Sequence, residues 1–121
     1  MPAARNLIVV DDDPHVRHAL QFAFETEGYD VSAYGRGEDL LAASPFGGTT
    51  CLVIDERLPG ISGLETVARL RALGFTAPAI LITTHPTPSM VTRAAAANVG
   101  IVEKPLVGDA LASRVRAELE A

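Results

Sequence analysis

The chain has 121 residues, of which 48% are hydrophobic and 5% aromatic, and its formal net charge is −5 at pH 7. A domain of this size buries about two thirds of its unfolded surface, so this composition predicts one folded domain over residues 1–121 and excludes a disordered chain. The acidic balance excludes nucleic-acid binding by this domain, because such binding depends on clustered Lys and Arg.

The apolar run at 7–10 is the first predicted strand. It is too short for a signal peptide or a membrane span, and three aspartates follow it. Cys51 is the single cysteine, which excludes a disulfide framework and predicts a buried, inert thiol in a reducing compartment. We therefore expect a cytoplasmic protein that makes no contact with the membrane.

Strands and helices alternate along the rest of the chain. In chain order, the sequence predicts a strand at 7–10, a helix from Asp13 and Pro14 to Gly28, a strand at 29–34, a helix at 38–43, a strand at 51–54, a helix from Ser62 to near Gly74, a strand at 79–83, a helix from Ser89 to about Ala97, a strand at 101–103 and a helix from about Asp109. Such an alternation predicts an α/β fold with parallel strands and crossover helices.

Polar residues follow four of these strands at the point where each strand ends. They are Asp11 to Asp13, Asp55, Thr83 and Lys104, after the first, third, fourth and fifth strands. Right-handed crossovers bring the carboxyl ends of parallel strands to one edge of the sheet, where ligands bind. Adjacent carboxylates repel one another unless a cation offsets their charge, and oxygen ligands suit Mg²⁺. A hydroxyl, an ammonium and a metal ion around Asp55 would stabilise phosphoryl transfer onto it.

Four segments at these strand ends occur in a characteristic order: IVVDDDP, LVIDERLPGISGLE, ILITT and VEKP. In this order and spacing they resemble the receiver domain of bacterial two-component response regulators, and the resemblance spans residues 5–120. It implies a flavodoxin-like, doubly wound five-stranded parallel sheet of order 2-1-3-4-5 with five helices. It also implies a phosphorelay domain that accepts a phosphoryl group from a sensor histidine kinase or a phosphotransfer protein. Such a domain is a signalling module that catalyses only its own phosphorylation and dephosphorylation.

The resemblance assigns roles around a Mg²⁺ ion. Asp55 matches the phosphoacceptor and is itself a metal ligand. Asp11 and Asp12 match the metal-binding acid pair, with Asp12 as the direct ligand and Asp11 as the water-mediated one. The backbone carbonyl of Arg57 would supply a further ligand to the metal.

The remaining site residues have roles by the same resemblance or by local signals. Thr83 matches the switch hydroxyl, and Lys104 matches the lysine that contacts the phosphoryl group and precedes a cis peptide bond. Asp13 lies outside the metal pair and is expected to cap the first helix. The side chains of Glu56 and Arg57 are expected to lie at the surface and to shape access to the site.

Several positions depart from the usual pattern of the family. Ile101 stands where many receivers carry an aromatic residue, so the usual coupled movement of a Thr and an aromatic ring cannot occur. Thr84 is larger than the common residue there and would crowd the phosphoryl group, and the 83–104 segment is about one residue short. Asn98 tolerates the left-handed conformation that ends a helix. The alanine-rich fourth helix is expected to be the most mobile element and to carry the signal to a protein partner.

Three other interpretations stay open at this stage. In the first interpretation, the chain is a receiver fragment of a DNA-binding transcription regulator whose output domain is missing. The segment LPGISGLE, which resembles receivers of that kind, favours it. Alternatively, it is a pseudo-receiver, an interaction module that is never phosphorylated; such a chain would break an acid or lysine position, and none is broken here. In the third interpretation, the chain is a flavin-binding electron carrier of the same topology. Such a protein needs a phosphate-binding loop rich in Ser, Thr or Gly after the first strand, where this chain has DDDPH.

Overall fold

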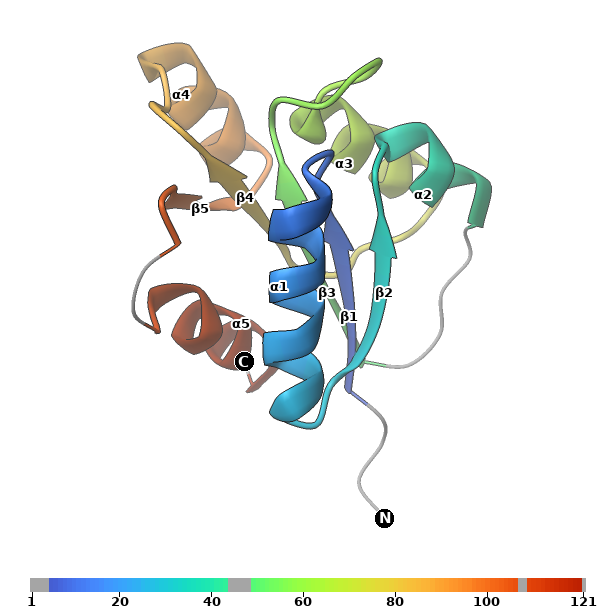
Figure 1. The fold of residues 1–121 in the computed structure, drawn as a ribbon. Helices are drawn as coiled ribbons and strands as arrows, with labels where there is room; N and C mark the ends of the chain where they lie inside the picture. The colour runs from blue at the N-terminus through green and yellow to red at the C-terminus, as the bar shows by residue number, and fades with distance from the viewer. Residues whose placement is uncertain (1–4, 44–48, 107–108, 121) are drawn as a thin grey trace.

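The computed structural model describes residues 5–43, 49–106 and 109–120 (Figure 1). The strands are β1 (Arg5–Val10), β2 (Asp30–Tyr34), β3 (Thr49–Asp55), β4 (Ala79–Thr83) and β5 (Gly100–Glu103). The helices are α1 (Pro14–Thr26), α2 (Gly37–Ala43), α3 (Gly63–Ala72), α4 (Pro88–Ala96) and α5 (Ala110–Glu120). All strand pairs are parallel, and the sheet order is β2-β1-β3-β4-β5, which confirms the predicted α/β fold class and topology.

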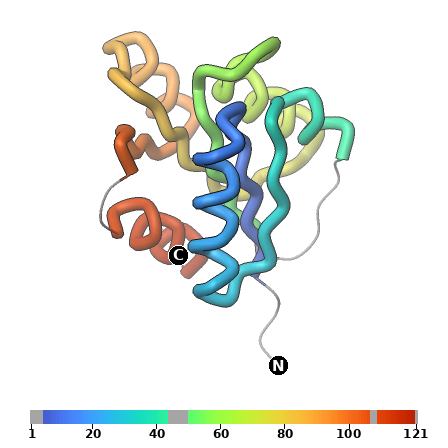
Figure 2. The backbone as a smooth tube through the Cα atoms, viewed as in Figure 1, coloured from blue at the N-terminus to red at the C-terminus, as the bar shows by residue number. Residues whose placement is uncertain are grey.

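Helices cover both faces of the sheet, with α1 and α5 on one face and α2, α3 and α4 on the other (Figure 2). Successive residues of the inner strands β1, β3 and β4 point alternately into two hydrophobic clusters. Leu7 of β1, for example, packs with α1 and α5, whereas its neighbour Ile8 packs with α2, α3 and α4. This two-sided burial explains why these strands are continuously apolar in sequence.

The edge strand β5 is less buried than its neighbour β4. All five residues of β4 are buried, whereas those of β5 are partly or fully exposed. Cys51 lies in the central strand β3, and burial raises the pKa of its thiol to about 12. The thiol is therefore protonated at neutral pH, as expected for an inert core residue. In the described residues, no helix combines the length and apolar character needed to span a membrane.

Local capping signals start α1 and α3 where they were expected, whereas α2, α4 and α5 each begin one residue away from the prediction. Asp13 caps α1 by accepting the His15 N–H at 2.9 Å, and Ser62 caps α3 by accepting the Glu65 N–H at 3.1 Å. Helix α4 begins at Pro88 and ends at Ala96, one residue earlier at each end than predicted. The reason is that the Thr87 hydroxyl is the N-cap, which puts proline at the first helical position.

Left-handed residues terminate three of the helices. Gly28 follows α1 with φ of 96°, Gly74 follows α3 with φ of 92°, and Asn98 follows α4 with φ of 57°. After α4, the Val99 N–H returns to the Ala94 carbonyl at 2.8 Å, which satisfies an end carbonyl of the helix. The predicted role of Asn98 in ending this helix is therefore confirmed.

Candidate functional site

Three carboxylates gather at the carboxyl edge of the sheet. Asp11 and Asp12 follow β1, and Asp55 ends β3, which pairs directly with β1. One oxygen from each of the three side chains lies within 4.8 Å of the others. Asp11 and Asp55 are buried, whereas Asp12 is exposed. The residues that the sequence placed at one edge thus form an oxygen-rich cluster with one side open to solvent; we call these three residues the acid cluster.

Lys104 bridges the two buried acids. Its Nζ lies 2.9 Å from Asp11 Oδ2 and 3.2 Å from Asp55 Oδ2. Its backbone N–H donates to the Thr83 carbonyl at 2.8 Å, and the following peptide bond to Pro105 is cis, as the resemblance implied. The lysine side chain is only 20% exposed, so its charge acts on the acids with little screening.

Further hydrogen bonds orient both buried acids. Asp11 Oδ1 accepts the Asp13 N–H at 3.0 Å, and Asp55 Oδ1 accepts the Arg57 N–H at 3.2 Å. The Arg17 guanidinium donates to the Asp11 carbonyl at 2.8 Å and so ties α1 to the end of β1. Asp11 and Asp55 therefore each have one oxygen on a backbone N–H and the other on Lys104.

Burial prevails in the ionisation of Asp55, whereas contacts with the acids prevail for Lys104. Burial raises the pKa of the Asp55 carboxyl; the Arg57 N–H and the charge of Lys104 oppose this rise, while the charge of Asp11 adds to it. Burial lowers the pKa of Lys104, but its hydrogen bonds to Asp11 and Asp55 and their charges outweigh burial, so this pKa is raised. Lys104 is thus cationic at neutral pH, and Asp55 is held in a site where extra positive charge would favour its ionised form.

Thr83 ends β4 beside the acid cluster. It is fully buried, and its hydroxyl donates to the Thr84 carbonyl at 3.4 Å. Because Asp55 is paired with Ile82 in the sheet, Thr83 lies one residue beyond the level of Asp55. Thr84 and His85 are exposed, and His85 is left-handed with φ of 54°. The Thr83 hydroxyl thus lies at the end of the strand next to β3, and the exposed residues Thr84 and His85 follow it.

Glu56 contradicts the expectation of a surface side chain. It is only 8% exposed, and its Oε1 accepts the Leu64 N–H in the first turn of α3 at 2.8 Å. The first N–H groups of a helix have no partner within the helix and attract a carboxylate, which explains the inward orientation. Arg57, by contrast, is exposed as expected. The local capping pattern of Ser62 and Glu65 does not reveal a cap contributed from eight residues away.

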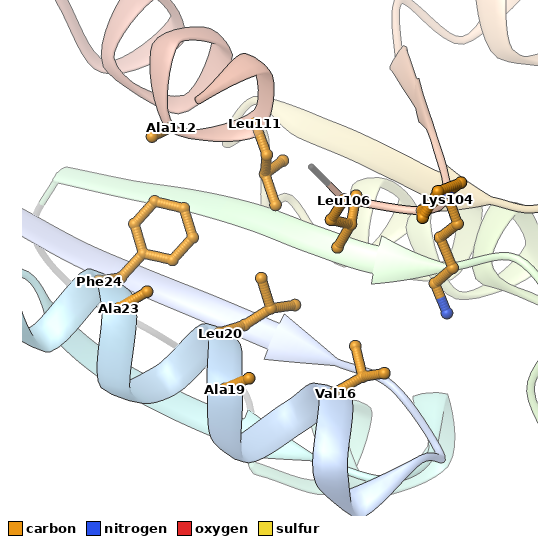
Figure 3. Close-up of a pocket in the computed structure, with 10 residues that line it drawn as sticks. Val16, Ala19, Leu20, Ala23, Phe24, Lys104, Leu106, Leu111 and Ala112 are labelled. Atoms are coloured by element: carbon orange, nitrogen blue, oxygen red, sulfur yellow. The ribbon is translucent and has the colours of Figure 1, made fainter. Parts of the chain in front are cut away.

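An apolar pocket of about 490 Å³ lies beside the acid cluster, between α1 and α5. Figure 3 shows Val16, Leu20 and Phe24 of α1 facing Leu111 of α5, with Lys104 at one end of the pocket. The predicted bounds of these two helices do not reveal the space between them. Lys104 therefore both pairs with two members of the acid cluster and lines the wall of this pocket.

Comparisons with known proteins agree with this geometry. The family model "Response regulator receiver domain" matches residues 7–116. The transcriptional regulatory protein FixJ of Azorhizobium caulinodans is 35% identical over 120 residues, covering 98% of this chain and 57% of FixJ. The uncharacterized transcriptional regulatory protein YkoG of Bacillus subtilis is 35% identical over 115 residues, covering 94% of this chain and 50% of YkoG.

A solved structure extends the similarity to three dimensions. The crystal structure of FixJ-N superposes with a TM-score of 0.84 at 30% identity, covering 98% of this chain and 94% of that one. The chain spans about half the length of the curated relatives named above. With five parallel strands in the receiver order and the acid cluster at their carboxyl edge, the chain belongs to the response regulator receiver domain family.

Proposed function

We propose that this receiver domain accepts a phosphoryl group on Asp55 from the phosphohistidine of a sensor histidine kinase or a phosphotransfer protein, with Mg²⁺ held at the acid cluster. We place this reaction in the cytoplasm. The observation that carries the proposal is the bridge from one lysine to two buried carboxylates at the carboxyl edge of the sheet. Receiver domains work with histidine kinases and output domains as signalling modules rather than metabolic enzymes, and this chain has their fold.

The acid cluster fits a hard divalent cation. Its donors are carboxylate oxygens within 4.8 Å of one another, and the exposed position of Asp12 leaves one side open to solvent. Asp12 would be the direct ligand, with Asp55 and the Arg57 carbonyl beside it and Asp11 acting through water. When bound, Mg²⁺ supplies positive charge that stabilises the phosphoryl oxygens during transfer. All of these groups offer oxygen atoms, which are the donors that Mg²⁺ prefers.

The residues of the chain divide the work of transfer among them. A carboxylate oxygen of Asp55 attacks phosphorus in line with the departing imidazole nitrogen; the P–O bond forms as the P–N bond breaks. Lys104 already holds Asp55 Oδ2 and would pass its ammonium contact to a phosphoryl oxygen. The Arg57 N–H orients the other oxygen of Asp55. Attack of water on phosphorus would then break the P–O bond to Asp55, which releases inorganic phosphate and restores the carboxylate.

Phosphoryl uptake by intact protein tests this proposal. With acetyl phosphate or phosphoramidate and Mg²⁺, mass spectrometry should show one added phosphoryl group on the wild type and none on Asp55→Asn. EDTA should prevent the addition. Modification of the Asp55→Asn variant to the wild-type extent would refute the assignment of the phosphoacceptor.

We further propose that α4 and its flanking loops carry the output to a protein partner. A phosphoryl group on Asp55 would attract the buried Thr83 hydroxyl, which now donates to the neighbouring Thr84 carbonyl. That exchange would shift the exposed 84–87 connection in front of α4. Hydrogen exchange with and without beryllofluoride and Mg²⁺ tests it, since changes confined to α1 would contradict this output face.

A second proposal is that the domain acts as the receiver part of a DNA-binding transcription regulator. The observation in its favour is that the FixJ and YkoG relatives are transcriptional regulatory proteins about twice as long as the matched region. An antibody against this domain, used to blot extracts of the source cells, provides the test. A band about twice the size of the 121-residue chain supports the proposal, and a band at the size of the chain alone contradicts it.

A further inference from the structure

The connection between β3 and α3, residues 56–62, is held by more than its own turns. We call it the 56–62 loop. The backbone N–H of Glu56 donates to the Ile82 carbonyl at 3.2 Å, and its carbonyl accepts the Gly63 N–H at 3.1 Å. Its side chain accepts the Leu64 N–H at 2.8 Å in a buried position. The residue next to the phosphoacceptor is thus bonded through its backbone to β4 and α3 and through its carboxylate to α3.

Helix α3 starts directly against the backbone of Asp55. A Cβ atom at Gly63 would lie 2.5 Å from the Asp55 carbonyl oxygen, which is closer than real Cβ contacts allow. Glycine therefore permits the approach, and the Glu56 carboxylate bonds the same helix turn. Any displacement of the first turn of α3 would move Asp55 and the residues that follow it.

A second carboxylate holds the far end of the loop. Glu38 of α2 accepts the Ile61 N–H at 3.3 Å through Oε2, although the two residues are 23 positions apart. Its Oε1 is buried and has no hydrogen-bond partner in the part of the chain that the structure describes. Burying a carboxylate oxygen in this way costs free energy, so the contact is poorly explained as a contribution to stability alone.

We propose that Glu56 and Glu38 are positioning residues for the metal site, which hold the 56–62 loop so that the backbone of Arg57 stays beside Asp55. Arg57 lies within this loop, and its N–H is bonded to Asp55 Oδ1 at 3.2 Å. Its carbonyl is the one metal ligand in the proposed site that comes from the backbone, so the position of the loop decides whether it can bind. The inference rests on the proposed function and extends it to residues outside the acid cluster.

Two substitutions at Glu56 separate its hydrogen bond from its volume and charge. Glu56→Gln keeps an oxygen that accepts the Leu64 N–H and removes the charge, whereas Glu56→Met keeps the volume and removes the acceptor. Glu38→Met tests the far end of the loop in the same way. Glu65→Met is the matched control, because Glu65 lies in the first turn of α3 but is exposed and pairs with Arg69.

Mg²⁺ titration of each folded variant, followed by NMR, gives the first measurement. Glu56→Met should weaken Mg²⁺ binding by about tenfold, as for other groups that orient metal ligands, and Glu38→Met by a smaller factor. Glu56→Gln and Glu65→Met should stay close to the wild type. Equal affinity in Glu56→Met and wild type would overturn the inference, and an equal loss in Glu56→Gln and Glu56→Met would show that charge, not position, is what matters.

A second measurement needs no metal and covers the case in which Glu56→Met does not fold. Glu38→Met should speed hydrogen exchange of the Arg57 amide in the metal-free protein, with little change in the amides of β1. Unchanged exchange at Arg57 would overturn the inference. If the wild type itself binds no Mg²⁺, the proposed function fails with it; if the wild type binds and the variants match it, only the positioning role fails.

Discussion

The two connections that leave the site at β3 and β4 are held very differently. After Asp55, the 56–62 loop is bonded by the carboxylates of Glu56 and Glu38, which come from different parts of the chain. After Thr83, the 84–87 connection has exposed residues at Thr84 and His85, and the Thr83 hydroxyl bonds the adjacent carbonyl. Adjacent strand ends can therefore differ in how firmly they are held: carboxylates bond the loop after Asp55, whereas the residues directly after Thr83 are exposed.

The largest expected effect comes from removing the Lys104 ammonium, which bridges Asp11 and Asp55. Lys104→Ala leaves Asp11 and Asp55 buried without their cation and should lower the free energy of unfolding in EDTA by about 3 kcal/mol. Urea denaturation measures this loss in the free energy of unfolding. Arg114→Ala removes an exposed ion pair with Glu118 and is the control, with an expected loss of less than about 1 kcal/mol. Similar losses in the two variants would contradict a central role for the lysine bridge.

The next effect compares the start of α3, which directly follows the 56–62 loop, with the 84–87 connection. Gly63→Ala would press a methyl group against the Asp55 carbonyl and should cost about 2 kcal/mol, as overpacking does in tight sites. Thr84→Ala, in the exposed connection, should change stability by no more than about 0.5 kcal/mol. Urea denaturation of both variants checks the difference. A larger loss for Thr84→Ala would reverse the comparison.

A smaller effect is expected from the exposed member of the acid cluster. Asp12→Asn removes repulsion from Asp11 and Asp55, so the metal-free variant should be at least as stable as the wild type. It should also weaken Mg²⁺ binding by at least about tenfold, because a ligand is lost. Thermal denaturation in EDTA and an NMR titration with Mg²⁺ measure the two results. Equal Mg²⁺ affinity in the variant and the wild type would remove Asp12 from the site.

The smallest effect is a pH dependence that belongs to Asp55. Because burial raises its pKa in the folded protein, protonated Asp55 favours folding, and this contribution is lost as pH rises through the folded pKa. Metal-free Asp55→Asn should therefore be more stable than the wild type at pH 7, and its advantage should shrink as the pH falls into the carboxyl range. Urea denaturation in EDTA at several pH values tests this. An advantage that grows at low pH would indicate a lowered pKa instead.

Local signals in the sequence were sufficient for the elements and for the residues at the strand ends. The acceptor of the His15 N–H lies two residues away at Asp13, and the alternation of apolar runs with helices requires no knowledge of distant contacts. The parallel arrangement then brings the ends of β1, β3, β4 and β5 to one edge, so Asp11, Asp55 and Lys104 meet as predicted. Where a residue and its partner are near in sequence, or both lie at the carboxyl ends of parallel strands, the sequence pattern alone identifies them.

Contacts between distant segments were decided only by the tertiary structure. The partner of Glu56 lies eight residues ahead in α3, and that of Glu38 lies 23 residues away across α2 and β3, so neither pair has a local pattern. An acidic residue beside Arg57 in a turn is typical of the surface, and that expectation was wrong for Glu56. Its burial depends on how closely α3 approaches the end of β3, and packing of helix on sheet sets that distance. The sequence thus determined which polar groups gather at the strand ends, while the fold decided which distant carboxylates bond the loop beside them.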